Sequence, residues 1–156
     1  MVRQTTLFRG KIKTLCLTST LHYRWPKSGD DLEQILKIDS RGYVIVHRKI
    51  SKGWKREKSF DYNKQNVQIL TEEMKMFSGQ TVKILNRIRR YFASTHLGLH
   101  VDDSGGEWKL ELTNLEGEVF LYYGYVGDYR ESLSRTTQLI RNATGMKYII
   151  GFDDNQ

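Results

Sequence analysis

The chain has 156 residues, with 25 Lys and Arg against 18 Asp and Glu, which gives a formal net charge of +7. This length fits one domain over residues 1–156, and 38% hydrophobic with 28% charged residues is typical of a globular protein with a continuous core. The single cysteine, Cys16, excludes an internal disulfide and a multi-cysteine zinc site, which favours a reducing compartment. Because no apolar run approaches the roughly 18 residues of a membrane span, we expect a cytoplasmic protein without a signal peptide.

The charge is unevenly distributed along the chain. Residues 1–100 hold 20 basic and 8 acidic side chains, whereas residues 101–156 hold 5 basic and 10 acidic side chains. This asymmetry suggests either a basic surface for an acidic partner or two faces of one domain that attract each other.

The first part of the chain is predicted to form an antiparallel meander. Its β-rich runs cover residues 7–25, 32–39, 43–50 and 54–62. Strict alternation of apolar and polar residues from Leu21 to Trp25 indicates a strand with one buried face. The short connection Ser40-Arg41-Gly42 is typical of a tight hairpin turn.

The hydrophobic period then changes to that of a helix. Asn66 is a candidate N-cap for a helix over residues 66–79, whose apolar positions are Val67, Leu70, Met74 and Phe77. A second helix is predicted over residues 81–93, because its apolar residues fall on one arc at about 100° per residue. These residues are Ile84, Leu85, Ile88, Tyr91 and Phe92.

The last part of the chain predicts a second hairpin and a closing helix. Trp108, Leu110 and Leu112 alternate with polar residues, and Glu116-Gly117 turns the chain into a strand over residues 118–126. Asp128 and Glu131 resemble a capping box for a helix that ends near Gly145. The positions expected to face inward on this helix are Tyr129, Leu133, Thr136 and Ile140. Residues 147–152 are expected to add a last strand.

These elements predict an α+β fold. We expect an antiparallel sheet of five to seven strands with about three helices packed mainly on one face, and the recurring hairpin-then-helix order suggests a ββα duplication. The layout resembles a set of small uncharacterised bacterial proteins over residues 42–143. In that set a charged meander leads into an acidic helix, followed by a Trp-x-Leu-x-Leu hairpin with a glycine turn and a closing helix. No function is known for that set, so the resemblance implies a layout and carries no catalytic residues across.

Nucleic-acid binding has the best positive signal in the sequence. Residues 48–58 hold six cations against Glu57 alone, beside the indole of Trp54, which could stack on a base while the cations neutralise phosphates. A basic stripe on the helix predicted over residues 81–93 extends the candidate surface. The candidate residues are Arg48, Lys49, Lys52, Trp54, Lys55, Arg56, Lys58, Lys83, Arg87 and Arg90. The alternative is a solvated ribbon kept soluble by its lysines, with Trp54 in the core.

A second hypothesis is a protein-interaction or self-associating module. Tyr122, Tyr123 and Tyr125 crowd the second strand of the second hairpin, with Tyr123 and Tyr125 on one face and Tyr122 on the other. Tyrosine is enriched at protein interfaces, so an exposed strand with these side chains favours contact with another protein or self-association, whereas an acidic protein is a candidate partner of the basic meander.

A metal-dependent hydrolase or nuclease is the third hypothesis. His96, His100 and Asp102 supply imidazole and carboxylate ligands in one short segment. Glu107-Trp108-Lys109 also matches half of a common nuclease signature. No phosphate-binding loop, nucleophile motif or cofactor motif accompanies them, and Cys16 lies between two leucines, as expected of a packed thiol. We therefore expect a non-enzymatic protein without a cofactor or bound metal.

Overall fold

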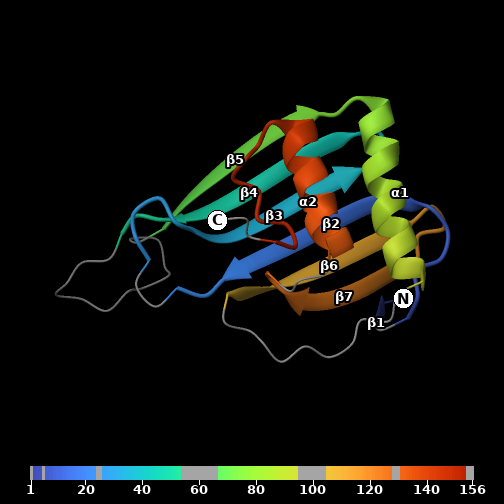
Figure 1. Ribbon diagram of the computed structural model, residues 1–156, viewed down its shortest axis with the longest axis horizontal. Helices are drawn as coiled ribbons and strands as arrows, with labels where there is room; N and C mark the ends of the chain where they lie inside the picture. The colour runs from blue at the N-terminus through green and yellow to red at the C-terminus, as the bar shows by residue number, and fades with distance from the viewer. Residues whose placement is uncertain are drawn as a thin grey trace.

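The computed structural model describes the backbone of residues 2–4 and all atoms of residues 6–23, 26–53, 67–94, 105–127 and 131–153. Seven strands form one sheet, and two helices accompany it (Figure 1). The strands are β1 (Val2–Gln4), β2 (Ile12–Leu21), β3 (Asp31–Asp39), β4 (Tyr43–Ser51), β5 (Val67–Lys75), β6 (Gly106–Asn114) and β7 (Val119–Tyr125). The helices are α1 (Ser78–Ser94) and α2 (Glu131–Thr144).

The strand order across the sheet is β1-β7-β6-β2-β3-β4-β5. Strands β2 to β7 all run antiparallel to their neighbours, whereas β1 pairs with β7 in parallel. The four strands β2–β5 form the predicted meander, and the hairpin of β6 and β7 joins it through β2. The expected α+β class and antiparallel sheet are therefore confirmed.

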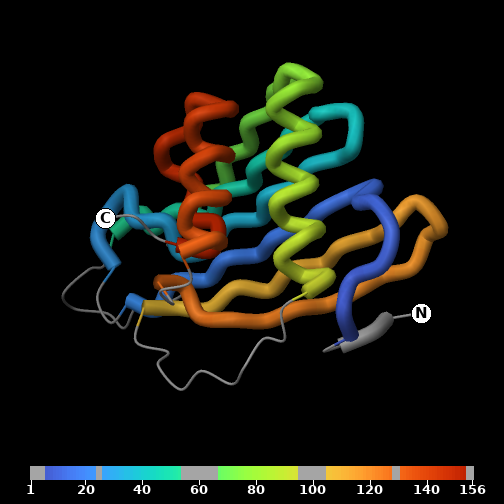
Figure 2. The backbone as a smooth tube through the Cα atoms, turned by 45° about the vertical axis from the view of Figure 1, so that its right-hand side comes forward, coloured from blue at the N-terminus to red at the C-terminus, as the bar shows by residue number. Residues whose placement is uncertain are grey.

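Both helices lie on the same face of the sheet, which we call the covered face (Figure 2). Alternate residues of each central strand point toward the helices and are buried there. The strand residues in this core include Leu15, Leu17, Leu110, Leu112 and Phe120, and the helix residues include Ile84, Ile88, Phe92, Leu133 and Ile140. The aromatic ring of Phe92 packs at 4.4 Å from that of Tyr122 and at 6.3 Å from that of Trp108.

The helix expected over residues 66–79 is wrong, and with it the count of about three helices. Residues 67–75 form β5, which pairs with β4 over the nine residues from Val67 to Lys75. As an edge strand, β5 buries neither of its faces, so its sequence has no alternating pattern and its apolar spacing resembles that of a helix by coincidence. Phe77 is 82% exposed and belongs to no buried stripe. Four meander strands, β2 to β5, therefore precede α1, whereas each unit of a ββα duplication would have two strands before its helix.

The last strand expected over residues 147–152 is also wrong. This segment lies as irregular turns against the covered face instead of pairing at a sheet edge. The Gln34 side chain of β3 forms the backbone hydrogen bonds that a neighbouring strand would otherwise form with this segment. Its Nε2 donates to the carbonyl of Tyr148, and its Oε1 accepts from the amide of Ile150, each at 2.8 Å. The Ser19 hydroxyl donates to the carbonyl of Gly151 at 2.6 Å.

The alternation from Leu21 to Trp25 does not form the predicted strand, because β2 ends at Leu21 and residues 22 and 23 lie outside any strand. Three further local predictions agree with the structure. The second hairpin forms from β6 and β7, helix α1 covers residues 81–93, and α2 buries Leu133, Thr136 and Ile140. The strand predicted over residues 54–62 lies outside the described residues, as do Asp128 and Tyr129.

Candidate functional site

The face of the sheet opposite the helices is solvent-exposed, and we call it the open face. The register of the strands places on it the side chains that alternate with the buried ones. Those that matter here are Thr14, Cys16, Lys37, Tyr43, Ile45, Lys49, Lys75, Lys109, Glu111 and Tyr123. Each is exposed or half-buried. Two of them, Tyr43 and Tyr123, are large aromatic side chains that are 48% and 49% exposed.

Tyr43 is flanked by two cations. The Arg41 guanidinium lies 5.3 Å from the centre of the Tyr43 ring, and the ammonium of Lys75, its cross-strand partner on β5, lies 5.2 Å from it. Asp39 accepts the backbone amides of Arg41 and Tyr43, which fixes the turn that places the three side chains together. An exposed aromatic ring with two cations nearby offers a base a stacking surface and offers its phosphates two positive charges.

A shallow groove of about 210 Å³ extends from Tyr43 across the open face. It runs over β4, β3 and β2, and Glu111 of β6 closes its far side. Its lining includes Thr14, Cys16, Lys37 and Ile45. The groove combines an apolar floor with a single cation, Lys37, and two carboxylates, Asp39 and Glu111.

The Cys16 thiol in this groove is expected to be a slow nucleophile. Burial, more than any nearby charge, raises the pKa of the thiol above its ordinary value. The reactive thiolate therefore forms only at higher pH than in the unfolded chain. We expect iodoacetamide to alkylate the folded protein more slowly than the urea-unfolded protein at neutral pH, with a rate profile displaced to higher pH. Equal profiles in the two states would contradict this.

Arg48, one of the predicted phosphate contacts, points to the covered face. Its guanidinium donates to both carboxylate oxygens of Asp31, at 2.9 and 3.0 Å, and lies 3.9 Å from the centre of the Tyr148 ring. These hydrogen bonds raise the pKa of Arg48 further, while burial and the nearby Glu72 carboxylate raise that of Tyr148. With its side chain only 17% exposed, Arg48 anchors the C-terminal segment to β3 and β4 and is already neutralised.

The other predicted cations that the structure describes do not share one surface. Lys49 is half-buried on the open face, and Lys52 is exposed just beyond the end of β4. Lys83, Arg87 and Arg90 lie on α1 behind the covered face, where Arg87 donates to the Thr136 hydroxyl of α2 at 3.3 Å. Trp54, Lys55, Arg56 and Lys58 lie outside the described residues.

The three predicted interface tyrosines lie on the two faces of the sheet, as their alternation along β7 predicts. Tyr122 is a core side chain whose hydroxyl donates to the carbonyl of Thr6 at 2.6 Å, and burial raises its pKa to about 12. Tyr123 and Tyr125 lie on the open face, opposite Lys109 and Glu107 of β6. Of the three, Tyr123 is the most exposed, whereas Tyr125 is half-buried.

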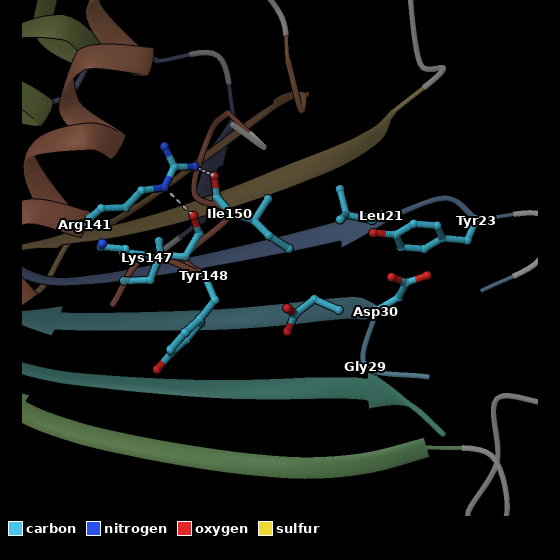
Figure 3. A pocket seen from close by; sticks show the side chains of 10 residues that line it. Leu21, Tyr23, Gly29, Asp30, Arg141, Lys147, Tyr148 and Ile150 are labelled. Atoms are coloured by element: carbon cyan, nitrogen blue, oxygen red, sulfur yellow. Dashed lines mark hydrogen bonds between the residues drawn. The ribbon is translucent and has the colours of Figure 1, made fainter. Parts of the chain in front are cut away.

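A second cavity, of about 230 Å³, lies on the covered face beside the C-terminal segment (Figure 3). Tyr23, Tyr148 and Asp30 are among the residues that line it (Figure 3), and Asp31 lines it as well. Asp30 accepts the Lys27 amide and Asp31 accepts from Arg48, so both carboxylates already have structural roles. We therefore interpret this cavity as the edge of a structural network.

The metal hypothesis gains no support from the described part of the chain. No group of three or more metal-ligating side chains occurs there, and His96, His100 and Asp102 lie outside it. Glu107 and Lys109 are exposed on β6, and Glu107 belongs to no group of three or more metal-ligating side chains among the described residues.

No helix in the described ranges has the length and apolar character to cross a membrane. Comparison with known proteins finds no family model, curated protein or solved structure that matches this chain.

Sequence reasoning missed Arg41 and Lys75, which the structure places beside Tyr43. The signal was present in part, because Tyr43 has the same parity as Ile45, on the face opposite the apolar Val44 and Val46. Assigning β5 to a helix removed Lys75 from the sheet and hid its pairing with Tyr43.

Proposed function

We propose that this chain is a non-enzymatic protein that binds single-stranded nucleic acid across the open face of its sheet. The observation that carries the proposal is the exposed Tyr43 ring with Arg41 and Lys75 close to it, at one end of a groove that leads over the central strands. Aromatic side chains that stack bases, combined with cations that contact phosphates, are the usual means by which a protein surface holds an unpaired strand.

The placement of the second exposed tyrosine favours the same surface. Tyr123 on β7 and Tyr43 on β4 are separated by four strand spacings across the sheet and by four residues along the strands, which is about 24 Å at roughly 4.8 Å per strand and 3.4 Å per residue. Lys109 is the cross-strand neighbour of Tyr123, so a cation adjoins an exposed ring at this end of the face too. Such a span suits a strand of several nucleotides, and a rigid duplex would not unstack its bases onto either ring.

The test is a salt-titrated binding assay with a labelled single-stranded oligonucleotide, as DNA and as RNA. We expect Tyr43→Ala to weaken binding about tenfold, because stacking of one base contributes about 1–3 kcal/mol. Replacing both Arg41 and Lys75 by glutamine is expected to lower the slope of log affinity against log salt by about 1.4, because each single-strand phosphate contact contributes about 0.7.

Two control variants test whether the site lies on the open face. Val82→Ala removes an exposed apolar residue from α1, which covers the other face of the sheet (Figure 2), and Lys83→Gln with Arg90→Gln removes two cations from the same helix. Both are expected to leave the affinity unchanged. Undetectable binding at low salt would overturn the proposal, as would a loss that follows an α1 variant instead of the open-face variants.

A further inference from the structure

Strand β5 ends the sheet with an unpaired edge. It is last in the strand order, and no described residue pairs with its outer side. Its register with β4 is regular over nine residues, and β5 contains no proline. Bulges, prolines, short length and charged side chains are the usual features that prevent an edge strand from pairing with another chain, and β5 has only the charges, in its C-terminal half.

The side chains of β5 are also unusually exposed for their composition. Ile69 on the open face is 59% exposed, and Leu70 on the covered face is 37% exposed. The charged residues Glu72, Glu73 and Lys75 are confined to the C-terminal half of the strand, which leaves its first five residues uncharged. An uncharged half-strand with apolar side chains on both faces favours strand addition.

We propose that two copies of this chain associate through antiparallel pairing of their β5 edges. This proposal is independent of nucleic-acid binding. If the helices of both copies lie on the same side of the joined sheet, the two-fold axis passes through one β5 residue, and side chains of equal parity face each other. The identity of that central residue then follows from which side chains would be opposed.

An axis at Leu70 gives the most favourable pairing. It sets Leu70 against its own copy, Ile69 against Thr71, and the Gln68 amide against the Glu72 carboxylate. Only the end pair of the seven residues 67–73, Val67 against Glu73, opposes an apolar side chain to a carboxylate. An axis at Thr71 would oppose both Leu70 and Ile69 to carboxylates, and an axis at Glu72 would oppose that carboxylate to itself. An axis at Ile69 would pair only five residues of β5.

The association closes at two chains. A two-fold interface uses the same edge on both copies, so no second β5 edge is left for a third chain. The opposite edge of the sheet ends in β1, which is three residues long and runs parallel to β7. The result is a single continuous sheet with a shared open face.

The first measurement is sedimentation velocity of the full chain over a range of concentrations. We expect a species of twice the chain mass that grows with concentration, and we expect Leu70→Lys to abolish it by placing two ammonium groups opposite each other. Phe77→Lys adds the same charge at the most exposed hydrophobic residue outside β5 and is expected to leave the dimer intact. A monomer at every concentration overturns the proposal, as does a dimer that survives Leu70→Lys.

A disulfide test fixes the register. In a Cys16→Ser background, Leu70→Cys places the two cysteines directly opposite each other, where Cα atoms are about 4.5–5.5 Å apart and a disulfide forms readily. Gln68→Cys would leave its copies four residues out of register, or about 14 Å apart at ~3.4 Å per residue, which is too far. We expect a crosslinked dimer under mild oxidation from the first variant alone. Equal crosslinking of both variants would overturn the Leu70 axis.

Discussion

Replacing Gly124 by alanine is expected to destabilise the protein by about 3 kcal/mol or to prevent folding. Gly124 lies opposite Trp108 on the covered face, and a Cβ atom there would lie 2.2 Å from the Trp108 Cζ2 atom. The indole cannot move aside, because its other contacts include the ring of Phe152 at 4.9 Å and that of Phe92 at 6.3 Å. Gly124 therefore provides the space in which Trp108 packs.

Urea unfolding followed by tryptophan fluorescence measures this effect. Gly79→Ala is the matched control, because Gly79 has ordinary backbone angles and no atom within 4 Å of the added Cβ. That variant is expected to be neutral or slightly stabilising. Trp108→Phe combined with Gly124→Ala is expected to recover part of the loss, since a smaller ring leaves room for the methyl group. An unchanged unfolding midpoint for Gly124→Ala alone would contradict this account of the packing.

Replacing Arg141 by alanine is expected to cost about 3 kcal/mol or more and to release the C-terminal segment. The buried guanidinium donates from Nε to the carbonyl of Ile149 at 2.8 Å, and from Nη2 to the carbonyls of Ile150 and Asp153. Removing it leaves these acceptors in a buried site without their charged donor. The segment that they hold also carries Phe152 into the core, so its contacts are lost together.

Urea unfolding measures the loss of stability, and amide hydrogen exchange over residues 149–153 shows where it occurs. Arg135→Ala is the control: Arg135 is an exposed residue of the same helix that pairs with Glu131, and we expect it to contribute less than about 0.5 kcal/mol. Arg141→Lys is expected to recover little, because one ammonium cannot reproduce a planar fork aimed at three carbonyls. Faster exchange across the whole chain, without preference for the C-terminal segment, would contradict a local role for Arg141.

The elements that the sequence predicted well are those with one buried face. Strand β6 is an example, because Trp108, Leu110 and Leu112 are buried and the residues between them are not. Its sequence therefore alternates between apolar and polar residues, which is the pattern of a strand with one buried face. The helix α1 could be predicted for the same reason, since its buried residues Ile84, Ile88 and Phe92 recur at helical spacing. Strand β5 buries neither face, so no pattern distinguished it from a helix.

The candidate site was harder to predict because it depends on register. Tyr43 and Lys75 are adjacent only because β4 and β5 pair as they do, and neither residue alone differs from an ordinary surface side chain. Arg48 illustrates the reverse error. Within a dense basic run it resembled a phosphate contact, yet Asp31, which lies 17 residues earlier, had already paired with it in the fold. Local charge density does not show which cations the tertiary structure neutralises.

The strand order also has a consequence for how the chain folds. The strands β2, β3, β4 and β5 are neighbours both in the sheet and along the sequence, so their pairing closes only short loops, apart from the longer one between β4 and β5. Strand β6 must instead find β2 across more than eighty intervening residues, and both strands lie in the centre of the sheet. Since closing a long loop costs entropy before its contacts form, docking of the second hairpin onto β2 is expected to limit the folding rate. We therefore expect the meander of β2 to β5 to form first and the hairpin of β6 and β7 to pair with it afterwards.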